Sequence, residues 1–230
     1  MDCFQTGTFR YRNEYAIVVV DVIRATTTAT TALDRGWRVF PAQTTDEAFV
    51  IASTKEDPLL VGELGGNMPY GFHLTNSPAQ VAARTDTHRP MILVSSSGTA
   101  LVMSSAGSPA AYIACFRNFT AVANHLIAHH DRVAVVGAGT RGQFRKEDQM
   151  CCAWIAEKLV AAGYKPETPQ TREYIYRWSG ARPEESRTSE SADYLRNSGQ
   201  TEDLEFVISH YDDLDIVPAL VNYELKVVNR

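Results

Sequence analysis

The stretch RVAVVGAGTRGQFRKED, residues 132–148, combines an apolar run, a glycine loop and two adjacent carboxylates. Gly137, Gly139 and Gly142 have the G-x-G-x-x-G spacing of a dinucleotide-binding loop. Such a site also needs a helix that begins inside the loop and a second strand with an acidic residue roughly 20 residues on. Here the helical pattern begins only near Lys146, and the segment after it, GYKPETPQT, is not strand-like. We therefore favour a loop whose backbone N–H groups receive a small anion, with an ordinary tight turn as the first alternative and the dinucleotide-binding loop of an oxidoreductase as the second.

Three more segments with similar chemistry follow predicted strands. They are DVIRATTT (residues 21–28), ELGG (63–66) and SSSGT (95–99). All are rich in glycine, serine or threonine, and Asp21 and Glu63 add carboxylates. Because ligands of α/β sheets bind at the carboxyl ends of the strands, we expect these segments and the glycine loop to share one edge of the sheet. An edge of this composition suits an anion held with a metal ion.

Several common routes of phosphate-ester hydrolysis lack their sequence signatures. The aspartyl-nucleophile pattern D-x-D fails because Ile23 stands two residues after Asp21. The cysteine-nucleophile pattern C-x5-R fails because the sixth residues after the cysteines at 115, 151 and 152 are Ala121, Glu157 and Lys158. Arg-His-Gly and G-x-S-x-G are absent from the sequence as well. An oxygen-ligated metal remains as the favoured chemistry.

The elements that must position these segments alternate between strand and helix. Continuous apolar runs predict strands at residues 16–22, 38–42, 59–62, 91–94, 110–114 and 132–136. Helical patterns are expected at 26–34, 46–54, 118–129 and 146–162, with another capped by Ser77 and Pro78. This alternation predicts an α/β fold with a mostly parallel sheet and helices on both faces.

The sequence changes character after Gly163. Residues 165–172 are polar and rich in Pro and Thr, 179–191 read as an exposed loop, and short helices are expected at 189–197 and 201–209. An apolar run at 216–228 closes the chain. We therefore expect an α/β core over 1–165 and an irregular, α-rich C-terminal extension over 166–230 that packs on it, with a single domain over 1–230 as the alternative.

Composition and charge indicate which partners and which cellular location to expect. With 230 residues, 44% hydrophobic and 21% charged, the chain is typical of a globular protein with a sizeable core. The net charge of −5 and scattered Lys and Arg argue against nucleic acid as a partner. No run reaches the roughly 18 apolar residues of a membrane span, and the N-terminal residues lack a signal-peptide pattern. We expect a cytoplasmic protein, and a homodimer by base rate.

Four sequence blocks resemble the 2-phosphosulfolactate phosphatases, Mg²⁺-dependent enzymes of coenzyme M biosynthesis. DVIRATTT (21–28) is similar to the family's D-V-L-R-A-T-T-T, and GELGG (62–66) with GFHLTNSP (71–78) to its G-E-x-G-G and G-F-D-L-x-N-S-P. AGTRGQFRKEDQMC (138–151) resembles A-G-T-x-G-x-F-x-x-E-D-T-x-C, and a weaker block lies in SESADYLRNSG (189–199) and DLEF (203–206). Together the blocks span nearly the whole chain.

The resemblance implies specific roles for residues in these motifs. Asp21, Glu63 and Asp148 are its candidate Mg²⁺ ligands, with Glu147 in place of Asp148 or beside it. Arg24, Asp21 and Asp148 are the candidate catalytic residues. Candidate substrate contacts are Arg24, Thr26, Thr27, Thr28, Asn76, Gly98, Thr99, Gly139 and Thr140. Each has a simpler structural alternative, such as a helix cap for Asp21 or an ion pair of Arg24 with Asp21 or Glu63.

The implied reaction is hydrolysis of a small phosphomonoester by water or through a phosphoenzyme. The sequence departs from the family pattern at Ser97, His73 and Gln149, where the motifs have Asn, Asp and Thr. The metal-binding frame therefore matches better than the substrate-facing residues, and a phosphorylated sugar or a nucleoside monophosphate is an alternative substrate. A non-catalytic anion-binding protein is the alternative from a different class. The cysteine at 151 is expected in the core rather than in catalysis.

Overall fold

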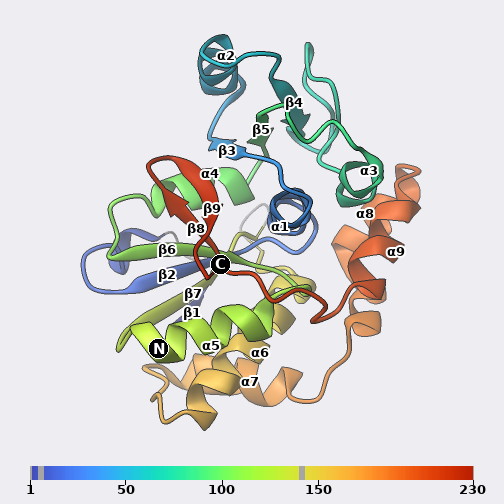
Figure 1. The fold of residues 1–230 in the computed structure, drawn as a ribbon. Coiled ribbons are helices and arrows are strands. Elements are labelled where there is room, and N and C mark those ends of the chain that lie inside the picture. The colour runs from blue at the N-terminus through green and yellow to red at the C-terminus, as the bar shows by residue number, and fades with distance from the viewer. Residues whose placement is uncertain (1, 5–7, 140–142, 230) are drawn as a thin grey trace.

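The computed structural model describes residues 2–4, 8–139 and 143–229 and contains a long sheet flanked by helices (Figure 1). The described strands are β1 (Asp2–Phe4), β2 (Ala16–Val20), β3 (Val39–Ala42), β4 (Leu59–Gly62), β5 (Met91–Val94), β6 (Ala110–Ala114), β7 (Val133–Gly137), β8 (Pro218–Val221) and β9 (Glu224–Val227). Their order in the sheet is β1-β7-β2-β6-β8-β9-β3-β5-β4. The predicted α/β class with a mostly parallel sheet is confirmed.

The sheet consists of two parallel blocks joined by a hairpin. β1, β7, β2 and β6 form one block, and β3, β5 and β4 form the other. The β8–β9 hairpin lies between them and pairs antiparallel with β6 and with β3. Because three successive pairings are antiparallel, the strands of one block point in the opposite direction to the strands of the other block. Neighbouring strands are rotated by roughly 20–25°, so a sheet this long coils, and Figure 1 shows β5 and β4 turned away from β2 and β6.

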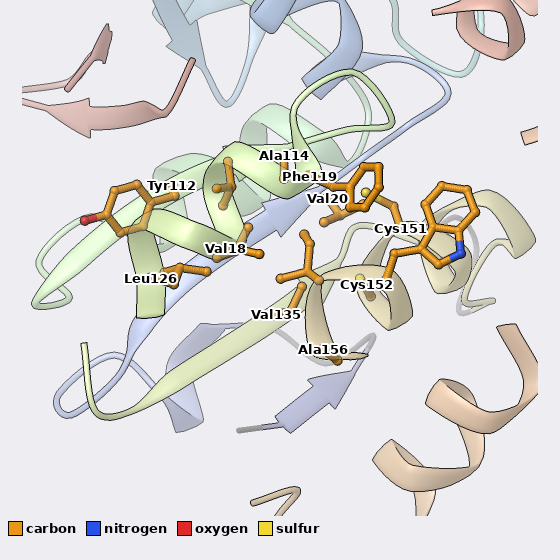
Figure 2. Close-up of a cluster of buried hydrophobic side chains, with 14 of the residues drawn as sticks. Val18, Val20, Tyr112, Ala114, Phe119, Leu126, Val135, Cys151, Cys152 and Ala156 are labelled. Carbon is orange, nitrogen blue, oxygen red and sulfur yellow. The ribbon is translucent and has the colours of Figure 1, made fainter. Parts of the chain in front are cut away.

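Both faces of the sheet are covered, which explains the continuous apolar runs. Val18 and Val20 of β2 pack with α5 (Phe119–His129) and α6 (Lys146–Ala161), as Figure 2 shows. Ile17 and Val19 of the same strand point to the other face, toward α1 (Ala25–Asp34). Burying each of these side chains contributes about 1.5–3 kcal/mol. Cys151 is fully buried in the first of these clusters, as expected of a core thiol.

The helices of the first two thirds begin close to their predicted positions. The remaining ones are α2 (Thr45–Ser53), α3 (Pro78–Ala83), α4 (Gly98–Ser104) and a short 3₁₀ turn, η1 (Thr8–Arg10). The Ser77 hydroxyl accepts a hydrogen bond from the Gln80 N–H, and Pro78 takes the first position of α3, as its sequence predicts. α1 consists almost entirely of Ala and Thr because it is buried against the sheet, α3 and α4. The N-terminus of α1 is thereby fixed inside the molecule.

The C-terminal part is more ordered than its sequence indicates. Its helices are α7 (Pro169–Trp178), α8 (Glu190–Asn197) and α9 (Thr201–Ser209), with a 3₁₀ segment, η2 (Pro183–Thr188), between α7 and α8. α8 and α9 match the predicted helices, whereas α7 and η2 fall in segments read as irregular. The cap explains α7: the Thr168 hydroxyl accepts from the Thr171 N–H, and Pro169 follows at the first helical position. Most residues of the predicted exposed segment are exposed, as expected, but Pro183 and Ser186 of η2 are buried, so the segment is an ordered 3₁₀ turn rather than an irregular loop.

The apolar run near the end of the chain forms the β8–β9 hairpin. Asn222 and Tyr223 occupy its two-residue turn with φ angles of 51° and 61°, the left-handed geometry that suits a tight hairpin. The segment after residue 165 thus supplies two strands to the middle of the sheet, and the proposed division at residue 165 stays a prediction. Nowhere in the described chain does a helix combine the length and the apolar character needed to cross a bilayer.

Candidate active site

Asp21 lies directly after β2, in the turn that leads into α1. The Thr26 hydroxyl donates to the Asp21 carbonyl at 2.8 Å and accepts from the Asp21 N–H at 3.0 Å, which fixes the backbone of this turn. The Asp21 carboxylate accepts from the Ala25 N–H at 3.3 Å, and the residue as a whole is 8% exposed. Its position therefore follows from the helix that begins beside it.

Gly98, at the start of α4, lies against the same carboxylate. A β-carbon at this position would stand 2.2 Å from Asp21 Oδ2 and 2.7 Å from the β-carbon of Ala25. The backbone of α4 can approach Asp21 only because residue 98 is glycine. The carboxyl ends of β2 and β5 meet here, although the two strands belong to blocks that run in opposite directions.

Glu63, after β4, joins the loops that follow β4 and β5. One of its oxygens accepts from the Ser96 N–H at 2.8 Å; the other accepts from the Ser96 hydroxyl at 2.9 Å and from the Gly66 N–H at 2.8 Å. The Gly65 N–H in turn donates to Ser96 Oγ at 2.7 Å. These bonds hold the glycine-rich loop against the turn before α4 and bring Glu63 to the side of Asp21.

Asp148 and Glu147 occupy the first turn of α6 and are both buried. The Val22 N–H donates to Asp148 Oδ1 at 2.8 Å, so Asp148 lies beside the turn that carries Asp21. Glu147 Oε2 is buried without a hydrogen-bond partner. The first turn of α6 thus brings two more carboxylates to the carboxyl end of β2.

The electrostatics of this group are unfavourable to further negative charge. Burial raises the pKa of Asp21 to about 7, and the neighbouring Glu63 and Glu147 add to the shift. Burial also raises the pKa of Asp148 well above its ordinary value, with contributions from Asp21 and Glu147. The pKa of Glu147 is raised as well, again chiefly by burial. Carboxylates that are buried close to one another are stabilised when they bind a proton or a cation, because either one removes uncompensated negative charge.

A divalent cation fits the donor set in charge and in kind. Within residues 2–4, 8–139 and 143–229, no three His, Cys, Asp or Glu side chains are close enough to form a preassembled metal cluster. Mg²⁺ does not require one, because it is usually held by one or two carboxylates with water and substrate oxygens completing its shell. The partnerless Oε2 of Glu147 is an acceptor of the type such an ion can satisfy.

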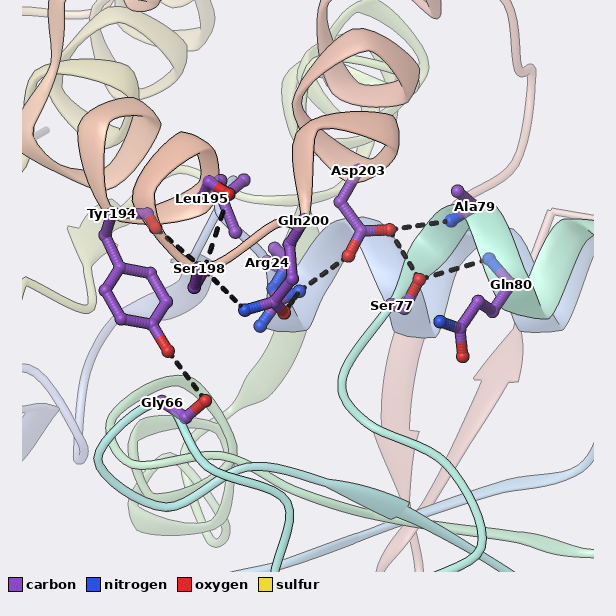
Figure 3. A network of polar contacts seen from close by, with 10 residues as sticks. All are labelled: Arg24, Gly66, Ser77, Ala79, Gln80, Tyr194, Leu195, Ser198, Gln200 and Asp203. Carbon is purple, nitrogen blue, oxygen red and sulfur yellow. Dashed lines mark hydrogen bonds and ion pairs between the residues drawn. The ribbon is translucent and has the colours of Figure 1, made fainter.

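Arg24, the residue before α1, is held by the C-terminal helices (Figure 3). Its Nη1 donates to Asp203 Oδ2 at 2.6 Å and to Gln200 Oε1 at 2.5 Å. Asp203 Oδ1 accepts from the Ser77 hydroxyl at 2.5 Å and from the Ala79 N–H at 3.2 Å. The predicted ion-pair alternative for Arg24 is therefore real, but its partner is Asp203. The motif DLEF contained that residue, although nothing in its spacing indicated the contact.

A cavity of about 570 Å³ opens in front of these residues. Its walls include four of the predicted site residues, Asp21, Arg24, Glu63 and Asn76. Asn76 is 2% exposed, and its Oδ1 has no hydrogen-bond partner. This volume is within the roughly 300–1,000 Å³ of small-molecule sites, so a ligand larger than phosphate fits.

The other predicted residues that the structure describes do not line the cavity. Thr27 donates to the Val22 carbonyl at 2.7 Å, and Thr99 exchanges hydrogen bonds with Ser95. Thr26, Thr28, Gly98, Gly139, Glu147 and Asp148 are likewise not among the residues that line the cavity. Thr26 and Gly98 instead set the position of Asp21. Thr140 lies outside the described residues.

One wall of the cavity comes from a part of the chain with no predicted role. Glu190, Ser191, Tyr194 and Leu195 of α8 line it, together with Arg145 before α6. The Tyr194 hydroxyl donates to the Gly66 carbonyl at 2.7 Å, which ties α8 to the loop after β4 (Figure 3). The weak resemblance at residues 189–199 was the available signal for this wall.

The fold and this site define an α/β enzyme class with a buried acidic group beside an arginine-bearing cavity. The family model described as 2-phosphosulpholactate phosphatase matches residues 5–223. The chain belongs to this family, whose members are phosphoric monoester hydrolases.

Curated relatives described as probable 2-phosphosulfolactate phosphatases are similar to this chain over most of its length. The chain is 34% identical over 218 residues to the probable 2-phosphosulfolactate phosphatase of Symbiobacterium thermophilum, covering 92% of this chain and 93% of the relative. It is 33% identical over 206 residues to that of Thermotoga maritima, covering 89% and 88%. With that of Pseudothermotoga lettingae it shares 38% identity over 147 residues, covering 64% and 63%.

Proposed function

We propose that the protein is a Mg²⁺-dependent phosphatase that hydrolyses a small phosphomonoester, with 2-phosphosulfolactate as the first substrate to test. The observation that carries this proposal is the position of Asp21, a buried carboxylate with a raised pKa at the wall of a cavity that Arg24 also lines. The names of the relatives supply the candidate substrate.

Each residue of the site has a role in the proposal. Asp21 and Glu63, which line the cavity, would hold Mg²⁺, and the predicted third ligand, Asp148 or Glu147, would join them only if the bound ion draws it closer. The bound ion would supply Lewis-acid stabilisation of charge on the phosphoryl oxygens. Arg24 would bind the remaining phosphoryl oxygens through its planar guanidinium, held in place by Asp203. The Asn76 amide, whose oxygen lacks a partner, would orient the substrate.

The nucleophile is water or the Asp21 carboxylate itself. A carboxylate at the cavity wall can accept a proton from an attacking water, or it can attack phosphorus and form a phosphoenzyme. Trapping of labelled phosphate on the protein after rapid acid quench would identify the phosphoenzyme route.

The deciding experiment is a substrate screen with Mg²⁺ and with a chelator present. The panel includes 2-phospho acids, sugar phosphates and nucleoside monophosphates, so it also tests the alternative substrates. Asp21→Asn should lower turnover by about 10²–10³-fold and leave the circular dichroism spectrum unchanged. Asp46→Asn, on the surface at the start of α2, is the matched control and should retain activity.

Two results would contradict the proposal. If anions bind but no phosphomonoester is hydrolysed, the protein is an anion-binding member of its family. If Asp21→Asn is nearly as active as the wild type, Asp21 is not part of the mechanism. Mg²⁺ binding has a separate readout, because an ion bound only by the folded state raises the melting temperature of the wild type more than that of Asp21→Asn.

The predicted cytoplasmic location and homodimer belong to the same proposal. Light scattering during size-exclusion chromatography would measure the oligomeric state, and cell fractionation the location.

A further inference from the structure

An ion pair on the cavity wall joins Arg145, before α6, to Glu190, the first residue of α8. Both residues line the cavity. Their exposures differ strongly: the Arg145 side chain is 15% exposed and the Glu190 side chain 67%. The arginine is therefore a fixed part of the wall, whereas the glutamate can turn into solvent at little cost.

The bonding of Arg145 is incomplete. Its Nη1 contacts Glu190 and donates to Gln143 Oε1 at 3.1 Å, but its Nε is buried without an acceptor. A guanidinium has five N–H donors in a planar fork that suits a carboxylate. A buried donor without a partner is destabilising, because it has lost its water and gained no acceptor. The pairing with Glu190 thus leaves capacity that an acidic ligand could use.

Arg145 differs from Arg24 in this respect. Among the described residues that line the cavity, these two arginines are the basic ones. Arg24 is held by Asp203, a buried partner whose side chain is 4% exposed. Arg145 is held by a solvated partner that a ligand can replace. The cavity of about 570 Å³ has room for an acidic group besides the phosphate.

We propose that Arg145 recognises a second acidic group on the substrate and that Glu190 is its internal competitor, displaced when that group binds. The inference rests on the proposed function for the identity of the phosphate-bearing ligand. The pair would make the enzyme selective among phosphate esters, because α8 places Glu190 on Arg145. An ester without a second acidic group leaves this pair intact and gains no binding energy from Arg145.

Two phosphonates, which have no ester bond to hydrolyse, distinguish the contribution of the second acidic group to binding from that of the phosphate. Phosphonoacetate carries a carboxylate where ethylphosphonate has a methyl group. Isothermal titration of both ligands, with Mg²⁺ present, gives their affinity ratio for the wild type, Arg145→Gln, Glu190→Gln and the double variant. Asp193→Asn is the matched control, because Asp193 is in the same helix, is 64% exposed and pairs with Arg196 away from the cavity wall.

The wild type should bind phosphonoacetate more tightly than ethylphosphonate. Arg145→Gln should reduce this preference about tenfold or more, the loss expected for a hydrogen bond to a charged group. Glu190→Gln should increase the preference about two- to fivefold, the scale of an exposed ion pair. In the Arg145→Gln background the Glu190 change should have no effect, and Asp193→Asn should leave the ratio unchanged.

Three results would overturn the inference. One is equal affinity of the wild type for the two ligands. Another is equal weakening of both ligands by Arg145→Gln, which would mean that Arg145 binds the phosphonate or only supports the wall. The third is an effect of Glu190→Gln that persists without Arg145. Because binding needs no turnover, a failed substrate screen refutes the proposed function while this ratio still tests Arg145.

Discussion

Arg24 and Asp203 form a buried ion pair in which Nη1 and Oδ2 are 2.6 Å apart and each side chain is 4% exposed. Asp203 also binds the N-terminus of α3 through Ser77 and Ala79. One carboxylate in α9 therefore connects the starts of α1 and α3 and fixes the guanidinium at the cavity wall.

Asp203→Asn should destabilise the protein by about 3 kcal/mol, because it leaves the charge of Arg24 buried without its partner. It should also raise KM, since Arg24 loses its fixed position. Urea unfolding and steady-state kinetics measure the two effects. The matched control is Asp213→Asn, which breaks the 2.6 Å pair between Asp213 and Arg117. An unchanged KM in Asp203→Asn would show that Asp203 only stabilises the fold.

Gly98→Ala should impair activity by displacing the Asp21 carboxylate. The new β-carbon would lie 2.2 Å from Asp21 Oδ2, and overpacking of this kind costs about 1–3 kcal/mol. Gly36→Ala is the comparator, because residue 36 has a φ of 93° and no neighbouring atom within 4 Å of a new β-carbon. It should be destabilised without loss of activity at a temperature where it is folded. Equal activity of the two variants would argue against the close fit of α4 to Asp21.

Tyr194→Phe removes the hydrogen bond that ties α8 to the Gly66 carbonyl. The expected cost is about 1 kcal/mol or less, since Tyr194 is partly exposed. Hydrogen exchange at the amides of Gly65 and Gly66 should become faster, because the loop loses a tether. Tyr176→Phe, at an exposed tyrosine of α7, should not change these rates. Unchanged exchange in Tyr194→Phe would mean that Glu63 and Ser96 hold the loop without help from α8.

The histidines at the end of α5 should contribute less to stability in mild acid, opposite in sign to the buried carboxylates Asp21 and Asp148, whose raised pKa values stabilise the fold as pH falls. The Tyr112 hydroxyl lies 3.1 Å from His125 Nε2 and 2.8 Å from His130 Nε2, and the His129 ring stacks on His125. Burial lowers the pKa of His125 and of His130, with His129 adding to both shifts; Asp131 opposes the shift of His130. Because the folded state binds these protons less readily than the unfolded chain, their contribution to stability is present above the ordinary pKa of 6.5 and is lost as pH falls below it.

The measurement is urea unfolding at pH 7.5 and at pH 5.5, values on either side of that ordinary pKa. The free energy of unfolding of His125→Gln, relative to that of the wild type, should be higher at pH 5.5 than at pH 7.5. His88→Gln, at an exposed histidine, should behave as the wild type does. An identical change in the free energy of unfolding for His125→Gln and the wild type would show that His125 does not contribute to the pH dependence.

The fold class and most elements could be predicted from local patterns. Strands buried on both faces are apolar throughout, so β2, β5 and β6 were recognisable, and caps such as Ser77 with Pro78 marked where a helix begins. α7 was missed because its polar, Thr-rich sequence has little apolar periodicity, and its capping residue Thr168 was the available signal. The hairpin β8–β9 was visible as an apolar run, but its place between two parallel blocks depends on pairing with distant strands.

The sequence by itself determined the family and the strand–helix alternation, and it predicted that the segments carrying Asp21 and Glu63 share one edge of the sheet. The structure added that Asp21, Arg24, Glu63 and Asn76 line one cavity. The catalytic roles of these residues stay predictions. Tertiary structure alone decided that Arg24 pairs with Asp203 and that Arg145 meets Glu190. The physical reason is range: strand and helix patterns depend on neighbouring residues, whereas an ion pair across the fold depends on how helices from distant parts of the chain pack.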